Sequence, residues 1–301
     1  MGNSSVIVET RSLNGSFAHE IIGIRLWEPQ SDEVVMALRD LWARHGVLVF
    51  RRQSLSEEEY ADFCEWFGPL EPPTRTDWVS ADHDKVVFIS NLKDFEGNEI
   101  GGLGSGEIDW HADQAYVPAP ATGSFLYAAQ TPKSGTPTYF ANLRLAYADL
   151  SDDIKARIDT AEAVHSYARR IATYVGKQPS EAEVRRRWPD VVHPLVHRDP
   201  VTGEGALYMD PLSMRAIVDW PQDEARQMLD DLLAHATQPQ YVYRHDWKPG
   251  DLVMWDNGLM LHRRDPVGAT HPRLLKRTTV MLPADRHIVP SGRRLEEAGV
   301  G

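Results

Sequence analysis

His111 and Asp113 stand two positions apart in the run EIDWHADQAY, and a further histidine that could join them, His262, lies far downstream. In an extended segment, residues i and i+2 point to the same side, so both side chains can reach one ion while Ala112 turns away. Two imidazoles and one carboxylate on one face of a metal leave three positions open, as is typical of non-haem Fe(II) centres that use O2. These residues therefore predict a metal site and indicate an oxygenase.

A second His-x-Asp pattern shows that this short motif is weak evidence when it stands alone. His197 and Asp199 have the same spacing, but they lead directly into PVTGEG, which is typical of an exposed turn between two strands. We therefore expect the metal at His111 and Asp113, and we expect the second copy to bind none.

Arg273 and Arg277 stand eleven and fifteen positions after His262, in the run PRLLKRTTVML. This run is rich in Leu, Thr and Val and predicts a β-strand. Positions 273 and 277 share one face of such a strand, so both guanidinium groups are expected to face one cavity, where they could bind two different anions. The alternative is a basic edge strand exposed to solvent.

Four motifs in this order resemble the taurine dioxygenase and 2,4-dichlorophenoxyacetate dioxygenase (TauD/TfdA) superfamily of Fe(II)/2-oxoglutarate enzymes. They are WHADQAY, SGTPTYFAN, GDLVMWDNGLMLH and PRLLKRT, and the resemblance extends from about residue 46 to residue 282. It implies that His111, Asp113 and His262 hold Fe(II) and form the catalytic centre, with 2-oxoglutarate and O2 as co-substrates.

The resemblance also assigns residues to the co-substrate. Thr138 and Arg273 would hold 2-oxoglutarate, although GTPT at residues 135–138 stands where the family usually has Gly-Gly-Asp-Thr. Arg277 would meet an acidic group of the substrate or support the co-substrate.

Departures from the family pattern bear on the substrate. Pro73 and Thr76 stand where taurine enzymes carry a His and a Tyr for the sulfonate, which argues against taurine. Glu107 replaces an Asn that contacts the substrate, and it could accept a hydrogen bond from an amine, amide or hydroxyl; the alternative is a solvated carboxylate. Three aromatic residues near the ligands are candidates for packing around the substrate, or for ordinary core packing: Trp110, Tyr116 and Trp255.

The predicted function is hydroxylation of an unactivated C–H bond of a small organic molecule, with succinate and CO2 as co-products; desaturation or ring closure stays open. We favour an amino-acid- or peptide-derived natural product as substrate, with a catabolic role on an aryloxy acid or sulfonate as the alternative. Two other classes could use similar ligands. A zinc hydrolase would want a general base and has no need of paired arginines. A cupin-like binding protein has no reason to keep Arg273 and Thr138 together.

The amino-acid composition limits the kinds of partner that we expect for this chain. The chain has 301 residues and a formal net charge of -12, which argues against a nucleic-acid partner. Its single cysteine, Cys64, cannot form an intramolecular disulfide and indicates a reducing compartment. Without an apolar run of eighteen residues or a secretory signal, we expect a cytoplasmic protein that acts on a small molecule and not at a membrane. Assembly into a homo-oligomer is compatible with these features.

Helix and strand alternate in the N-terminal third. Residues 31–45 have apolar positions at helical spacing and end at Gly46, a typical C-cap. The run VLVF predicts a buried strand, and Ser56 followed by three glutamates predicts a capping box at the start of a second helix. We interpret the apolar faces of both helices as core packing.

The rest of the chain predicts strands separated by helical insertions. Strands are expected at VVHPLV, ALYM, QYVYRH and DLVMWDN, with a helix over residues 222–236. Residues 143–160 predict paired helices with Ser151 as a cap. Residues 161–188 are basic and helix-prone and could form a lid that shields the site from water; the alternative is a solvated helical face.

We therefore predict a single domain over residues 1–301, of the α+β, β-rich class. The resemblance implies a double-stranded β-helix, or jelly-roll, core, with helical insertions at about residues 143–190. The stretch from about residue 285 loses periodicity and predicts a loose tail.

Overall fold

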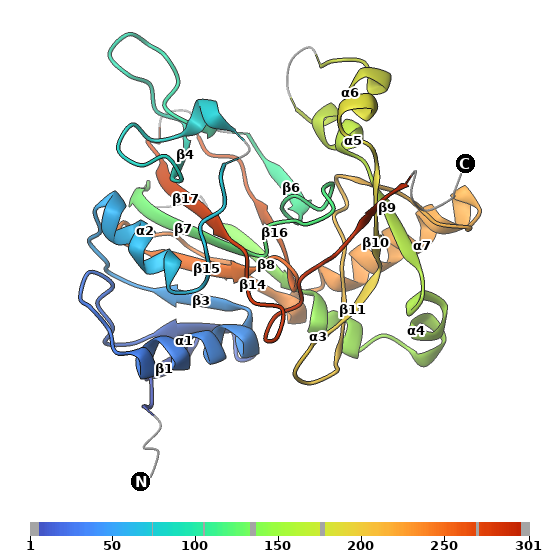
Figure 1. Cartoon of the computed structure of the whole chain (residues 1–301), viewed down its shortest axis with the longest axis horizontal. Helices are drawn as coiled ribbons and strands as arrows, with labels where there is room; N and C mark the ends of the chain where they lie inside the picture. Colours follow the sequence, from blue (N-terminus) through green and yellow to red (C-terminus); the bar gives the residue numbers. More distant parts are fainter. Residues whose placement is uncertain are drawn as a thin grey trace.

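The computed structural model describes residues 6–73, 75–104, 106–132, 137–174, 178–268 and 271–295. Helices and strands are both present, and strands dominate (Figure 1). The helices are α1 (Asp32–His45), α2 (Glu57–Glu65), α3 (Leu143–Ala148), α4 (Asp152–Ile158), α5 (Tyr167–Ala172), α6 (Glu181–Arg187) and α7 (Gln222–Ala236), with 3-10 turns η1 (Thr76–Trp78) and η2 (Pro239–Tyr241). None of these described helices is long and apolar enough to span a membrane.

The strands fall into two halves of the chain. The first half holds β1 (Thr10–Ser12), β2 (Ala18–Ile21), β3 (Val47–Phe50), β4 (Val87–Ser90), β5 (Gly102–Leu103), β6 (Ile108–His111), β7 (Gly123–Gln130) and β8 (Thr138–Asn142). The second half holds β9 (Glu162–His165), β10 (Val191–Pro194), β11 (Val196–Arg198), β12 (Gly205–Leu207), β13 (Met214–Ile217), β14 (Val242–His245), β15 (Leu252–Asp256), β16 (Met260–Arg264), β17 (Leu274–Val280) and β18 (Arg293–Arg294).

Two sheets that face each other hold the candidate site. The larger sheet has eight strands in the order β1-β2-β3-β15-β7-β17-β4-β5, and the other has four in the order β14-β8-β16-β6. Apolar side chains from both sheets form one cluster, in which Phe140 of β8 packs on Trp255 of β15 with 5.4 Å between ring centroids. Side chains between the sheets are therefore shielded from solvent. A reactive centre at this place would be protected from water.

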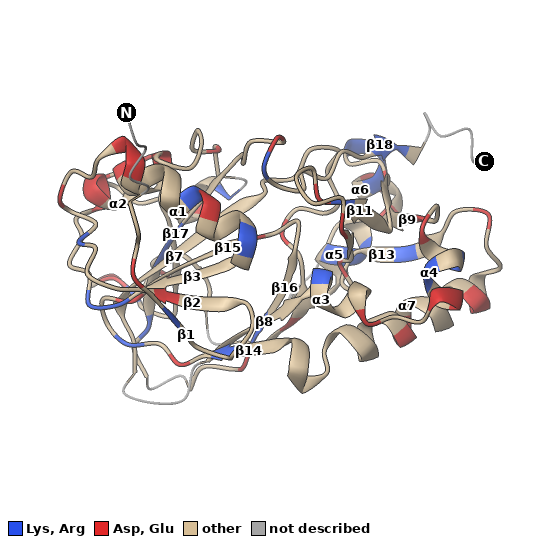
Figure 2. Cartoon of the chain, turned by 90° about the horizontal axis from the view of Figure 1, so that it is seen from below, with Lys and Arg blue, Asp and Glu red and all other residues tan. Residues whose placement is uncertain are grey.

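Helices cover the two ends of the molecule. α1 and α2 pack against the eight-stranded sheet, whose strands β3, β15 and β17 they contact. A third sheet, β13-β9-β10-β18, lies with α4, α5, α6 and α7 at the other end (Figure 1). In Figure 2, acidic positions mark α7, basic positions mark α5 and β13, and α4 carries both kinds. The basic segment predicted from the sequence thus belongs to this second end.

The ends of the longer helices are set by the local signals that the sequence carries. The Ser31 side chain accepts a hydrogen bond from the first turn of α1, and Gly46 ends that helix with a φ of 78°, a conformation that favours glycine. Ser56 and Glu59 form the reciprocal capping box of α2. These predictions, and that of a helix over residues 222–236, are confirmed.

In residues 143–188 the predicted helix pair is confirmed, and the expected conformation of one stretch is corrected. α3 and α4 form the expected helix pair, and Ser151 caps α4. The segment 161–188 was expected to be helix-prone throughout, but it begins with β9, whose last three residues are buried. Four residues are too few to show a helical or strand period, so the pairing of β9 with β10 and β13 decides its conformation.

Residues 285–295 are packed, so the expectation of a loose tail is wrong for this stretch. Ile288 is only 2% exposed. The His287 Nδ1 atom lies 2.8 Å from Asp256 Oδ2, and both side chains are buried. β18 also pairs with β10. All these partners are distant in sequence, so no local periodicity marks them; residues 296–301 lie outside the described residues.

Replacing Ile288 by alanine should lower the free energy of unfolding by about 2–4 kcal/mol, because the change leaves a cavity in a closely packed apolar cluster. Urea denaturation followed by circular dichroism measures this difference. Val201→Ala is the control, since Val201 is 68% exposed and its loss should change stability by less than about 0.5 kcal/mol. Equal effects of the two changes would show that the tail does not support the core.

Candidate active site

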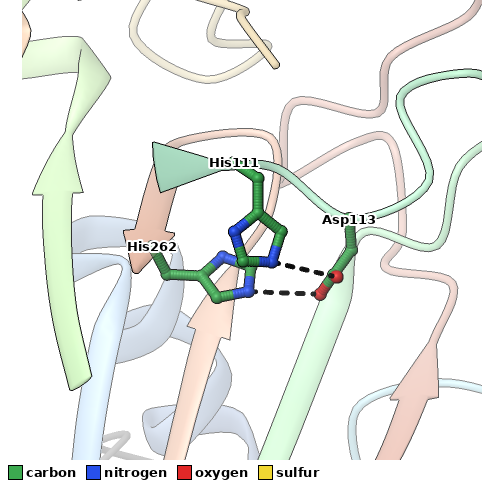
Figure 3. A group of neighbouring side chains, drawn as sticks. All are labelled: His111, Asp113 and His262. Atoms are coloured by element: carbon green, nitrogen blue, oxygen red, sulfur yellow. Dashed lines mark ion pairs between the residues drawn. The ribbon is translucent and has the colours of Figure 1, made fainter. Parts of the chain in front are cut away.

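The candidate metal ligands meet where β6 and β16 pair. His111 is the last residue of β6 and lies opposite His262 of β16, with 4.0 Å between ring centroids. Asp113 lies in the turn after β6, not on an extended strand as expected, and its carboxylate points at both imidazoles (Figure 3). In the described part of the chain these three form the one group of histidine, cysteine and acidic side chains able to hold a metal, with ligand atoms within 4.8 Å of one another.

The distances within this group suit one metal ion. The Nε2 atom of His111 is 4.0 Å from Asp113 Oδ1, and the Nε2 atom of His262 is 3.7 Å from Asp113 Oδ2. Two ligand atoms that each bind a metal at about 2.1 Å and at right angles are about 3 Å apart, so small side-chain adjustments suffice. The Nδ1 atom of His111 lies 2.8 Å from the Asp109 carbonyl. An N–H that donates to this carbonyl places the free lone pair on Nε2, facing the ion.

The protonation states of these groups also suit a metal. Burial lowers the pKa of His111 well below its usual value and lowers the pKa of His262 to about 4, so both rings are neutral near pH 7. Burial alone would raise the pKa of Asp113, but the charge of the Arg277 guanidinium outweighs it and holds that pKa below its usual value. Neutral imidazoles with an ionised carboxylate are the ligand forms that divalent metals bind.

A cavity of about 230 Å³ opens beside this group. Aromatic side chains make up much of its wall: Trp78, Tyr116, Tyr167, Tyr174, Trp188 and Trp255. Guanidinium groups supply most of its charge: Arg75, Arg170, Arg263, Arg264, Arg273 and Arg277. Asp113 is the one carboxylate among the described residues that line it. The cavity thus combines apolar walls with an excess of positive charge.

Thr138 and Arg273, the residues predicted to hold the co-substrate, both line the cavity. Arg273 is 1% exposed, and its Nε and Nη1 atoms have no hydrogen-bond partner in the described chain. The Thr138 hydroxyl accepts a hydrogen bond of 2.9 Å from Trp247 Nε1. Burial, together with the charge of Arg264, lowers the pKa of Arg273 to about 9, so it stays protonated at neutral pH. A buried cation without a counterion is unfavourable, and an anionic ligand would relieve this.

Arg277, from the middle of β17, also lines the cavity but already has an anionic partner. Its Nη2 atom donates a hydrogen bond of 2.6 Å to Asp113 Oδ2. The expectation that Arg273 and Arg277 face one cavity is therefore confirmed. The contact with Asp113 links Arg277 to a candidate metal ligand, and a role toward the substrate stays a prediction.

The sequence analysis missed four of the arginines that line the cavity, and two of these four, Arg264 and Arg170, are buried. Arg264 is 5% exposed, and its Nη2 atom donates a 2.7 Å hydrogen bond to the Leu103 carbonyl and another to Gly106. A signal for it existed, because positions 262 and 264 share one face of β16. Arg170, on α5, is 8% exposed and had no such signal, because the buried face of a short, isolated helix depends on how it packs.

The remaining substrate candidates divide into two groups. Tyr116 and Trp255 line the cavity, and the Trp255 ring lies 4.9 Å from that of His262. Trp110 is not among the lining residues, because neighbours on a strand point to opposite sides; its ring packs on Tyr139 and under the Arg263 guanidinium instead. Glu107 is exposed and is not among the lining residues either.

The second His-x-Asp pattern forms a hairpin turn, as expected. His197 lies on β11, which pairs with β12. The Asp199 carboxylate accepts hydrogen bonds of 2.9 Å from the backbone N–H groups of Val201 and Thr202. Asp199 therefore closes the turn, and neither residue belongs to a metal-binding group among the described residues.

Comparisons with known proteins agree with this geometry. Residues 9–279 match the family model described as Taurine catabolism dioxygenase TauD, TfdA family. Pentalenolactone F synthase of Streptomyces avermitilis is 31% identical over 269 residues, which cover 84% of this chain and 86% of that protein. The (S)-phenoxypropionate/alpha-ketoglutarate-dioxygenase of Sphingobium herbicidovorans is 31% identical over 278 residues, 87% of this chain and 91% of that protein.

A solved structure is also similar over most of its length. The crystal structure of AAD-2 in complex with Mn(II) and N-oxalylglycine has a TM-score of 0.78 and 29% sequence identity, and the match covers 92% of this chain and 98% of that one.

Proposed function

Because this chain belongs to the taurine catabolism dioxygenase TauD, TfdA family, it is an oxidoreductase that uses 2-oxoglutarate and O2, and we propose that it hydroxylates a small organic acid. The reaction would convert 2-oxoglutarate, O2 and a C–H bond of the substrate into succinate, CO2 and an alcohol. We also propose that the chain is a single domain whose facing sheets form the double-stranded β-helix core of the family.

In this proposal His111, Asp113 and His262 hold Fe(II). The bound Fe(II) would supply the redox chemistry that couples oxidation of 2-oxoglutarate by O2 to oxidation of the substrate. Arg273 would pair with the distal carboxylate of 2-oxoglutarate, and the Thr138 hydroxyl, which already accepts from Trp247, would donate its own hydrogen to the same group. The arginine and the threonine would thereby fix the orientation of the co-substrate.

The unpaired guanidinium of Arg273, in the same cavity as the metal-ligand group, carries the proposal. A zinc hydrolase would need a general base, but the one carboxylate among the described lining residues is Asp113, itself a candidate ligand. A cupin-like protein that only binds an anion could use the same buried cation, but it would not form succinate from 2-oxoglutarate, and this product distinguishes the two classes. A dioxygenase that binds a dianionic co-substrate uses both Arg273 and Thr138.

The charges in the cavity favour an acidic substrate. Arg75 and Arg263 pair with Asp77 and Asp265. The other four lining arginines and Fe(II) would carry six positive charges. Asp113 and dianionic 2-oxoglutarate supply only three negative charges, so an anionic substrate improves the balance.

The residues that line the cavity favour a different substrate from the one that the sequence favoured. An amino-acid- or peptide-derived substrate rested largely on Glu107, which is exposed and does not line the cavity. Aromatic walls with surplus positive charge suit an acid with an apolar body. One relative is named for such a compound, (S)-phenoxypropionate.

A paired screen tests the proposal. Phenoxyacetate, phenylacetate and octanoate should each stimulate formation of succinate by the Fe(II)-loaded protein more than their neutral amides do, because only the acids bring a charge to the arginines. Mass spectrometry should find one oxygen atom from labelled O2 in an alcohol product. Equal stimulation by acids and amides would contradict the acidic substrate, and failure to consume 2-oxoglutarate in any reaction would contradict the activity itself.

A further inference from the structure

We propose that Arg170, on α5 of the segment between β9 and β10, binds the anionic group of the substrate and so selects small acids. This inference rests on the proposed function and assigns its substrate specificity to one residue. It also gives α5, whose residues line the cavity, a role in recognition.

The helix presents Arg170 to the cavity. Tyr167, Arg170 and Tyr174 all line the cavity, and their spacing of three and four positions places them on one side of α5 and the turn that follows it. Arg169, the neighbouring residue, is exposed. The helix therefore separates two adjacent arginines, one turned to the cavity and one turned to solvent.

Arg170 is a buried cation that forms no ion pair with the described residues. It is 8% exposed, and its buried Nη1 atom has no hydrogen-bond partner in the described part of the chain. The guanidinium lies 5.6 Å from the centroid of the Tyr174 ring. Burial alone would lower the pKa of Arg170, but the charges of Asp210 and Asp113 raise it, so the guanidinium stays charged although no ion pair joins it to either carboxylate in the described part of the chain. A buried, charged guanidinium with an unused N–H group in a cavity is suited to an anionic ligand.

The other buried arginines of the cavity have partners or an assigned ligand. Arg277 donates to Asp113, and Arg264 donates to the Leu103 and Gly106 carbonyls. Arg273 is assigned to 2-oxoglutarate. Arg264 keeps its Nε and Nη1 atoms unpaired among the described residues, but its Nη2 atom is fixed on those two backbone carbonyls. Arg170 makes no such hydrogen bond to the described chain, and we therefore assign it to the substrate.

Arg170 is also close enough to the metal centre to hold a substrate there. Arg170, His111 and His262 line the same cavity of about 230 Å³. Between α5 and the metal-ligand group stand aromatic side chains, since Tyr116 packs against Tyr167 with ring centroids 4.7 Å apart. An acid bound at Arg170 would thus lay its apolar body along these rings, toward the candidate metal ligands.

Binding measurements without O2 test this assignment. The protein is loaded with Fe(II) and 2-oxoglutarate, and calorimetry measures its affinity for phenoxyacetate, phenylacetate, octanoate and the three neutral amides. Arg170→Ala should weaken binding of the acids by roughly 10- to 100-fold, as expected for loss of a hydrogen bond between charged groups. Binding of the amides and of 2-oxoglutarate should stay unchanged. Arg170→Lys should recover part of the loss, because it restores the charge but not the planar fork.

Arg169→Ala is the matched control, because it removes the same charge from the same helix at an exposed position. It should leave every affinity unchanged, and thermal melting checks that each variant is folded. Equal loss of acid and amide binding in Arg170→Ala would assign Arg170 a structural role and overturn the inference, as would unchanged acid binding. If the acids fail to bind the wild-type protein while 2-oxoglutarate binds, the inference fails but the dioxygenase activity stands. If 2-oxoglutarate itself fails to bind, the proposed function fails.

Discussion

Replacing either His111 or His262 by alanine should abolish the weak visible absorption band that Fe(II) and 2-oxoglutarate give together without O2. The band requires a keto-carboxylate chelated to iron, and each change removes one of the three candidate protein ligands. Loss of a residue that only orients a ligand costs about 10- to 100-fold in metal affinity, so loss of a ligand should cost at least as much. Anaerobic titration of the metal-free protein with Fe(II), with and without 2-oxoglutarate, measures both effects.

His197→Ala supplies the control for this experiment. His197 belongs to the second His-x-Asp pattern, and it lies outside the metal-binding group of the described residues. The variant should keep both the band and the iron affinity of the wild-type protein. A protein that prefers Zn(II), and whose iron spectrum does not respond to 2-oxoglutarate, would show that the oxygenase interpretation is wrong.

The parts of the fold that the sequence predicts well are those fixed by local interactions. Ser31, Gly46 and Ser56 mark helix ends because their side chains or backbone angles satisfy groups only a few residues away. His111 and Asp113 likewise come from one short segment. By contrast, β9 and residues 285–295 owe their conformation to distant strands, so nothing in their own sequence indicates it.

The residues of the candidate site also divide into those that the sequence indicates and those that only the folded structure brings to the site. His262 and Arg277 lie on β16 and β17, Arg273 directly precedes β17, and all three line the cavity; their spacing indicated that they belong together. Arg264 could have been found, since it shares the face of His262 on β16. The contact of Arg277 with Asp113 and the inward orientation of Arg170 could not, because both depend on segments that are not paired in a common register.

Arg273→Ala should weaken the binding of 2-oxoglutarate by about 2–4 kcal/mol, or 30- to 1000-fold in affinity. The change removes a buried guanidinium that is free to pair with the distal carboxylate, and it leaves that carboxylate without a cation. Arg273→Lys should not recover the full affinity, because an ammonium lacks the planar fork. Calorimetric titration of the Fe(II)-loaded variants without O2 measures these constants.

Arg277→Ala is the comparison, since the Arg277 guanidinium is engaged with Asp113. It should change the affinity for 2-oxoglutarate much less than Arg273→Ala does. Equal losses in the two variants would show that both arginines bind the co-substrate. The surplus of positive charge available to an acidic substrate would then be smaller, and Arg170 would have to supply most of it.

Removing the charge of Arg273 should stabilise the ligand-free protein, although it weakens the binding of 2-oxoglutarate. Burial lowers the pKa of Arg273 to about 9, which means that the folded state disfavours its charged form. Arg273→Met keeps the apolar part of the side chain and removes the charge, so it should raise the free energy of unfolding by about 1–4 kcal/mol while 2-oxoglutarate binding is lost. Urea denaturation without metal or 2-oxoglutarate measures the change. A destabilised Arg273→Met variant would show that the guanidinium supports the fold itself, and the argument that its burial is offset only by a bound anion would fail.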